Sequence, residues 1–139
     1  MNGVMYMVDD ATLKRARDVK ILSIVGVSLV AVYLFEGIFA LLIALLPLSV
    51  FGLLITVPLN IIEFFMMIGA IVVNIMAIVM SVGLDKEIEF APESEEKNSA
   101  KKDIKLAKLL SLIGVISTAV AVVGLSLLNF VELLLSLFI

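Results

Sequence analysis

Three long apolar blocks constrain this chain more than any other feature. They cover residues 21–46, 58–84 and 106–139. Each is longer than the roughly 20 residues that an α-helix needs to cross a ~30 Å hydrocarbon core. The polar stretches 9–20 and 85–105 are each too short to build a core of their own. We therefore predict an all-α integral membrane protein with three long hydrophobic helices and no separate soluble domain.

Two prolines set the expected boundary between the first two helices. Pro47 and Pro58 bracket the apolar run 48–57, which is too short to cross a membrane. Proline is tolerated in the first turn of a helix but not in its interior, so we expect Pro47 to end the first helix and Pro58 to begin the second. Thr56 is then a candidate cap, and the run is an apolar hairpin at the far membrane surface. A single bent helix through Pro47 is the alternative.

The expected organisation is one helical membrane domain that follows a flexible N-terminus. Asp10 and Ser99, or Asn98, are the expected N-caps of the first and third helices. The expected segments are the N-terminus 1–9, the domain 10–139 with helices at about 10–46, 58–84 and 99–139, and the charged loop 85–98.

The ten lysine and arginine residues fall into two groups, one before the first block and one around the charged loop. The hairpin and the C-terminal end have none. With three spans the two basic groups lie on the same side, as the positive-inside rule requires. We expect a multi-pass protein of the cell membrane with its basic segments in the cytoplasm.

A short internal repeat relates the first and third helices. Residues 20–27 read KILSIVGV and residues 108–115 read KLLSLIGV. The match extends backwards, with Lys14, Arg17 and Lys20 facing Lys102, Lys105 and Lys108. Duplication and a shared interfacial environment both explain the match, and both predict that the two helices run parallel.

Small and polar residues recur at steps of three and four in each helix. Such stripes let helix backbones approach closely in lipid and imply left-handed packing. They serve contacts within one molecule or between subunits, and the stripe of the third helix is clear only in its first half. The predicted packing and assembly residues are Ser23, Gly26, Gly37, Ala40, Ala70, Asn74, Ala77, Ser111, Gly114, Thr118 and Ala121.

Glu36 and Asn74 are the predicted intramembrane polar residues. Glu36 lies roughly 24 Å from the basic boundary, inside the hydrocarbon, whereas Glu63 is expected at the far interface at roughly 33 Å. We expect Glu36 to be protonated and to share hydrogen bonds, for example with Tyr33. Ion translocation and snorkelling to the surface are the other interpretations. Asn74, near the midplane, is expected to bond across helices.

Missing residue types narrow the chemistry. The chain has no cysteine and no histidine, so disulfides, thiolate chemistry and the commonest metal ligand are absent. No nucleophile–base pair or metal-ligand cluster is apparent, so we expect neither an enzyme nor a metal site. The expected bound molecule is membrane lipid. Scarcity of cysteine and amides points to a thermophilic source.

Basic residues next to the membrane are the predicted anion-binding set. Their partners are lipid head groups or, in a ring or tube of subunits, nucleic-acid phosphates met without sequence readout. The set is Lys14, Arg17, Lys97, Lys101, Lys102 and Lys105.

Long hydrophobic helices, one short lysine-bearing loop, small-residue seams and almost no soluble part make the chain resemble a known family. It resembles the pilins of type IV secretion and conjugation systems, in particular archaeal DNA-import pilins, in architecture over about residues 10–139. The resemblance implies subunits that leave the membrane as an extracellular helical filament, retain lipid and turn the lysines of the loop towards a lumen through which nucleic acid passes.

Two other functions compete with a pilin-like homo-oligomer. A small subunit of a transporter or ion-translocating complex would use Glu36 and Asn74 as its polar pathway. A holin-like pore former would permeabilise the host membrane.

Overall fold

Three long helices make up the described part of the chain. The computed structural model describes residues 10–44 and 50–138, which hold α1 (Asp10–Ala44), α2 (Val50–Glu89) and α3 (Glu95–Phe138) and no strand. Each helix is long and apolar enough to span a membrane. The predicted all-α membrane fold of three helices is confirmed. The flexible N-terminus expected at 1–9 and Pro47 lie outside the described residues.

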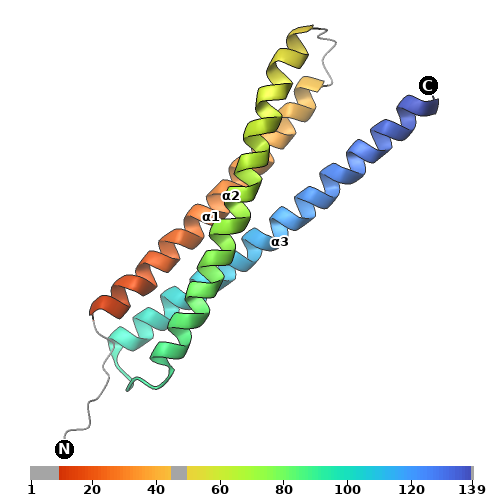
Figure 1. Cartoon of the computed structure of the whole chain (residues 1–139). Helices are drawn as coiled ribbons and strands as arrows, with labels where there is room; N and C mark the ends of the chain where they lie inside the picture. The colour runs from red at the N-terminus through yellow and green to blue at the C-terminus, as the bar shows by residue number, and fades with distance from the viewer. Residues whose placement is uncertain (1–9, 45–49, 139) are drawn as a thin grey trace, which may run out of the picture.

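The helices form a bundle that opens at one end. α1 and α3 run in the same direction and α2 runs against them (Figure 1). Every pair of helices is in contact, and α1 and α2 still meet at the level of Gly37 and Glu63. α3 packs on both partners near its N-terminus and diverges from them towards its C-terminus (Figure 1).

The predicted start of the second helix at Pro58 is wrong. α2 begins at Val50, so the run 50–57 is helical rather than a hairpin, and Pro58 lies inside the helix. Hydrocarbon offers no hydrogen bonds, so an apolar segment that leaves its backbone unpaired loses several bonds at once. A helix that continues through Pro58 loses only the bond that its missing N–H would have made to the carbonyl of Leu54.

The charged loop is shorter than predicted. α2 continues past Leu84 to Glu89, and α3 begins at Glu95 rather than near Ser99. Ser94 is the cap, because its hydroxyl accepts a hydrogen bond of 3.1 Å from the backbone N–H of Lys97. Glu95 and Glu96 then occupy the first turn, where negative charge is favourable.

The end of the bundle near this loop holds a small apolar core. We call this region, residues 10–20 and 84–108, the polar end. Neither of its two chain segments forms a core alone, but together they bury a cluster in which Val19, Ile88 and Ile104 are the largest members. Leu13 packs against the cluster from the side. Alanines fill the remaining positions: Ala16, Ala91, Ala100 and Ala107.

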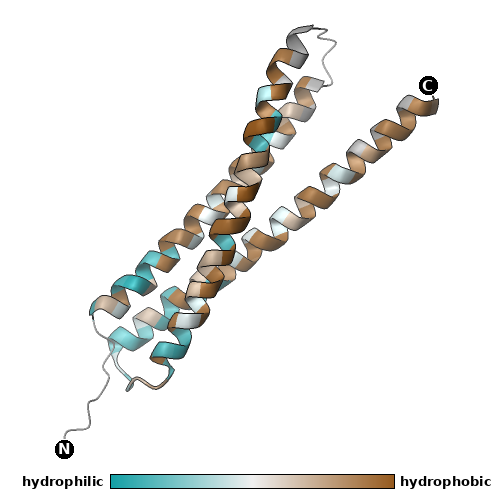
Figure 2. Ribbon diagram, viewed as in Figure 1, coloured by the Kyte–Doolittle hydropathy of each residue, from teal (hydrophilic) through white to brown (hydrophobic). Residues whose placement is uncertain are grey.

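Most of the outer surface is apolar. Hydrophilic residues gather at the polar end, and hydrophobic residues cover the helices over most of their length (Figure 2). Phe35, Phe65 and Val120 expose about two thirds of their surface. A surface of this size and apolarity belongs in lipid, because water would penalise it heavily. The described chain is a membrane protein with helices that can serve as transmembrane spans.

Candidate functional site

A seam of small and polar residues runs through the middle of the bundle. At this seam the structure buries nine of the predicted packing residues, while Ala40 and Ala121 are half-buried. We call the nine buried residues the central seam: Ser23, Gly26, Gly37, Ala70, Asn74, Ala77, Ser111, Gly114 and Thr118. Whether they also serve contacts between subunits stays a prediction.

Asn74 occupies the centre of the seam. Its side chain lies between Gly26 of α1 and Gly114 of α3, so close that a methyl group on either glycine would overlap its amide. On Gly114 that methyl carbon would lie 2.5 Å from Asn74 Oδ1. The two residues that repeat in the sequence as Gly26 and Gly114 therefore contact the same side chain from two sides.

The polar groups of the seam bond mainly within their own helices. Asn74 Nδ2 donates to the carbonyl of Ala70 at 2.8 Å, and Thr118 Oγ1 donates to that of Gly114 at 2.8 Å. Ser23 and Ser81 donate in the same way to Lys20 and Ala77, each at 2.6 Å. In the described residues, Asn74 Oδ1 and Ser111 Oγ are buried without a hydrogen-bond partner. The expected cross-helix hydrogen bond of Asn74 is thus absent, and van der Waals contact replaces it.

Two carboxylates face one another where α1 and α2 continue beyond the seam. Glu36 and Glu63 are near enough for their charges to interact, and Glu63 also interacts with Tyr33. A methyl carbon on Gly37 would lie 3.2 Å from Glu63 Oε1. Glu36 Oε2 is buried and has no hydrogen-bond partner in the described part of the chain. The expected bond from Glu36 to Tyr33 is not formed.

The predicted difference in depth between these carboxylates is wrong. Gly37 follows Gly26 by 11 residues, and Glu63 precedes Asn74 by 11 residues, so both lie equally far from the contact at the centre of the seam. The prediction counted Glu63 from the end of the apolar block. That end lies further out on α2 than Lys20 does on α1, because Lys108 reaches out to bond Asp85 there.

Three ion pairs join the helices at the polar end, one for each pair of helices. Arg15 of α1 binds Glu87 of α2 at 2.7 Å, Lys20 of α1 binds Asp103 of α3 at 3.2 Å, and Lys108 of α3 binds Asp85 of α2 at 2.6 Å. Lys20 and Lys108 are the equivalent lysines of the repeat. Each ties its own helix to a different neighbour.

Lys97 has a different role from the one predicted for it. Its side chain is 5% exposed, and its ammonium donates to the carbonyls of Ala91 at 2.5 Å and Glu89 at 3.4 Å. It also reaches Glu93 at 3.4 Å. These carbonyls follow the end of α2, where helices leave acceptors unpaired. Lys97 closes the loop between α2 and α3 and is not available to head groups or nucleic acid.

The other predicted anion-binding residues are exposed at the polar end. Lys14, Arg17, Lys101, Lys102 and Lys105 form no ion pair among the described residues. Three or more carboxylates, histidines or cysteines arranged to hold a metal ion do not occur in the described ranges. No family model, curated protein or solved structure matches this chain.

Sequence reasoning missed the ion pairs and the groove described below. Arg15 and Glu87 are 72 residues apart, and nothing local marks them as partners. The signal available was the repeat, because equivalent lysines at Lys20 and Lys108 imply similar surroundings.

Proposed function

We propose that this protein is a structural subunit of a helical assembly built from membrane protein, pilin-like and of the conjugation or DNA-import type. Its basic polar end would face the cytoplasm before assembly. The observation that carries the proposal is the open half of the bundle, meaning the parts of the helices beyond Gly26, Asn74 and Gly114.

The open half leaves polar groups incompletely covered. α3 has no buried residue among its described side chains after Thr118, and Glu36 and Glu63 are only half-buried. Hydrocarbon chains do not solvate a carboxyl group, so contact with lipid alone is costly there. A helix from a second copy would cover these groups and the free face of α3. In the absence of a catalytic constellation, repeated self-association accounts for the small size and the uncovered faces together.

Cross-linking tests the contact between copies. The chain has no cysteine, so a single Val123→Cys substitution on α3, at an exposed position, introduces the only thiol. We expect oxidation in native membranes to yield disulfide-linked dimers. Phe90→Cys, at an exposed position in the loop far from the open half, is the control and should stay monomeric. Equal cross-linking of both variants would indicate random collision and contradict the proposal.

Ion translocation is a second candidate function, favoured by the adjacency of Glu36 and Glu63. A carboxyl pair inside a membrane, with one buried oxygen unpartnered, has the chemistry needed to take up and release a proton or cation. Glu36→Gln keeps the size of the side chain and removes its charge. Under this candidate, the variant loses proton or cation flux in liposomes and still assembles. Unchanged flux, or no flux in the unmodified protein, would remove the candidate.

A further inference from the structure

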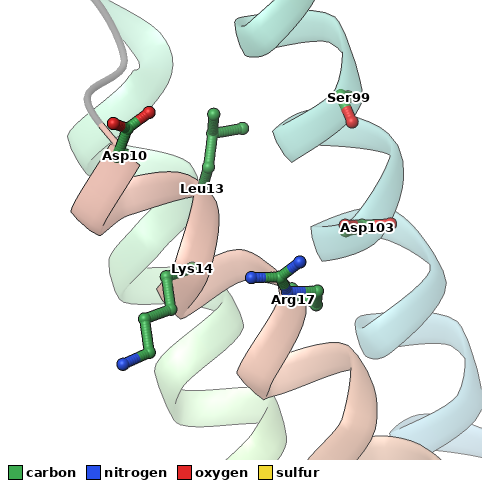
Figure 3. Close-up of a pocket in the computed structure, with 6 residues that line it drawn as sticks. All are labelled: Asp10, Leu13, Lys14, Arg17, Ser99 and Asp103. Atoms are coloured by element: carbon green, nitrogen blue, oxygen red, sulfur yellow. The ribbon is translucent and has the colours of Figure 1, made fainter.

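A shallow polar groove lies between the first turns of α1 and the facing turns of α3 (Figure 3). Its volume is about 440 Å³. Leu13 forms part of its wall and packs against the apolar core of the polar end, so the base of the groove is fixed by packing. The lining residues are Asp10, Leu13, Lys14 and Arg17 of α1, and Ser99 and Asp103 of α3.

The groove carries one uncompensated positive charge. Asp103 is neutralised by Lys20, which binds it at 3.2 Å. The remaining charged residues of the lining are Lys14 and Arg17 against Asp10 alone. Neither cation forms an ion pair in the part of the chain that the structure describes. Two cations against one carboxylate leave a net charge of +1, which one singly charged anion would balance.

Arg17 has the best position to bind that anion. It stands at the edge of α1 next to α3, level with Asp103, whereas Lys14 lies further from α3 (Figure 3). A guanidinium presents several N–H donors in a plane and binds phosphate oxygens in pairs. The Ser99 hydroxyl, on the opposite wall, supplies a further donor.

The groove also lies at the depth of lipid phosphates. Exposed apolar side chains begin at Ile21 on α1 and at Leu106 on α3. Arg17 precedes Ile21 by four residues, or roughly 6 Å along the helix axis. The head-group layer extends roughly 5–8 Å beyond the hydrocarbon on each side. A lipid whose chains cover Ile21 and Leu106 would therefore present its phosphate to Arg17.

We propose that this groove binds the phosphate of one membrane lipid, with Arg17 as the principal donor and Ser99 as the second. Lys14 adds charge at the outer edge, and Asp10 disfavours head groups that carry more than one negative charge. The proposal concerns the single subunit and does not depend on polymerisation, so its test and that of the assembly have separate outcomes.

The experiment measures lipid binding to the detergent-solubilised full chain by native mass spectrometry with added phosphatidylglycerol. We expect Arg17→Gln to weaken binding at least about tenfold and Ser99→Ala to weaken it severalfold. Lys86→Gln is the matched control, because Lys86 is exposed at the same end of the molecule, on α2 and outside the groove. Circular dichroism of each variant checks that the helices are retained.

Three outcomes decide the proposal. A loss in Arg17→Gln with unchanged binding in Lys86→Gln supports it. Equal losses in both variants would show general attraction of anionic lipid to a basic surface and overturn it. Inorganic phosphate or a short DNA duplex that displaces the lipid when added in excess would assign the groove to a soluble phosphate or to nucleic acid, and would likewise overturn the lipid assignment.

Discussion

The polar end and the central seam of the same bundle are held together in opposite ways. The polar end buries an apolar cluster and joins its helices by three ion pairs. The central seam buries glycine, serine, threonine and asparagine and turns its large apolar side chains outwards. Water surrounds the first region and hydrocarbon surrounds the second, and each region places inside what its solvent would not reward outside.

The difference shows which interactions specify the fold at each level. In water, burial of Ile88 and Ile104 releases apolar surface from solvent. In lipid that gain disappears, and close backbone approach with van der Waals contact is what remains. Substitutions at the central seam should therefore act through shape, whereas those at the polar end should act through charge and capping.

The largest effect is expected from filling the space around Asn74. Gly26→Ala or Gly114→Ala places a methyl group on the amide of Asn74, and the side chain has no free direction because each glycine blocks its retreat from the other. We expect the free energy of unfolding in detergent to fall by about 2–3 kcal/mol.

Gly69→Ala and Gly124→Ala are matched controls for that prediction. Nothing lies within 4 Å of a methyl carbon at either position, so alanine should be neutral or stabilising by up to about 1 kcal/mol. Equal destabilisation of the controls and of Gly114→Ala would contradict the packing described for the central seam.

A smaller effect sharpens the same comparison. In an Asn74→Ala background the overlap is gone, so adding Gly114→Ala should cost much less than it does alone. A double-mutant cycle should give a coupling free energy of about 1–2 kcal/mol. Additive effects of the two substitutions would mean that Asn74 and Gly114 are not in contact.

At the polar end, Lys97→Ala is expected to destabilise by about 1 kcal/mol, because the carbonyls of Glu89 and Ala91 lose their buried donor. Lys101→Ala, at an exposed position on the same helix, is the control and should change little. The measurement is the free energy of unfolding in detergent, together with protease sensitivity of the loop 90–94. Similar values for the two variants would show that Lys97 does not close the loop.

The smallest effect is expected from the ion pairs. Their side chains are between 23% and 51% exposed, so Lys108→Met should cost only about 0.2–1 kcal/mol. Raising the salt concentration should reduce the difference between this variant and the unmodified protein. A salt-independent loss would show that Lys108 acts through packing instead.

The sequence predicted best where a single helix decides the outcome. Steps of three and four residues marked the stripe that includes Ser23, Asn74 and Thr118, because helical periodicity alone places such residues on one face. The limit of the clear stripe in the third helix matches the loss of burial after Thr118.

Features that depend on two segments were predicted poorly. Pro58 resembled a helix start because local rules do not contain the cost of unpaired backbone in lipid. Lys97 resembled an exposed cation because its acceptors, Glu89 and Ala91, are placed by the turn of the loop. The depth of Glu63 depended on how far α2 is shifted along α1, which only the contact at Asn74 determines.

The most direct test of the proposed assembly is electron microscopy of the native protein, both sheared from cells and gently extracted from membranes. The account predicts tubes with a regular helical repeat that persist after extraction. Discrete small particles alone, in both preparations, would contradict a filament-forming subunit and would make ion flux through Glu36 and Glu63 the leading explanation.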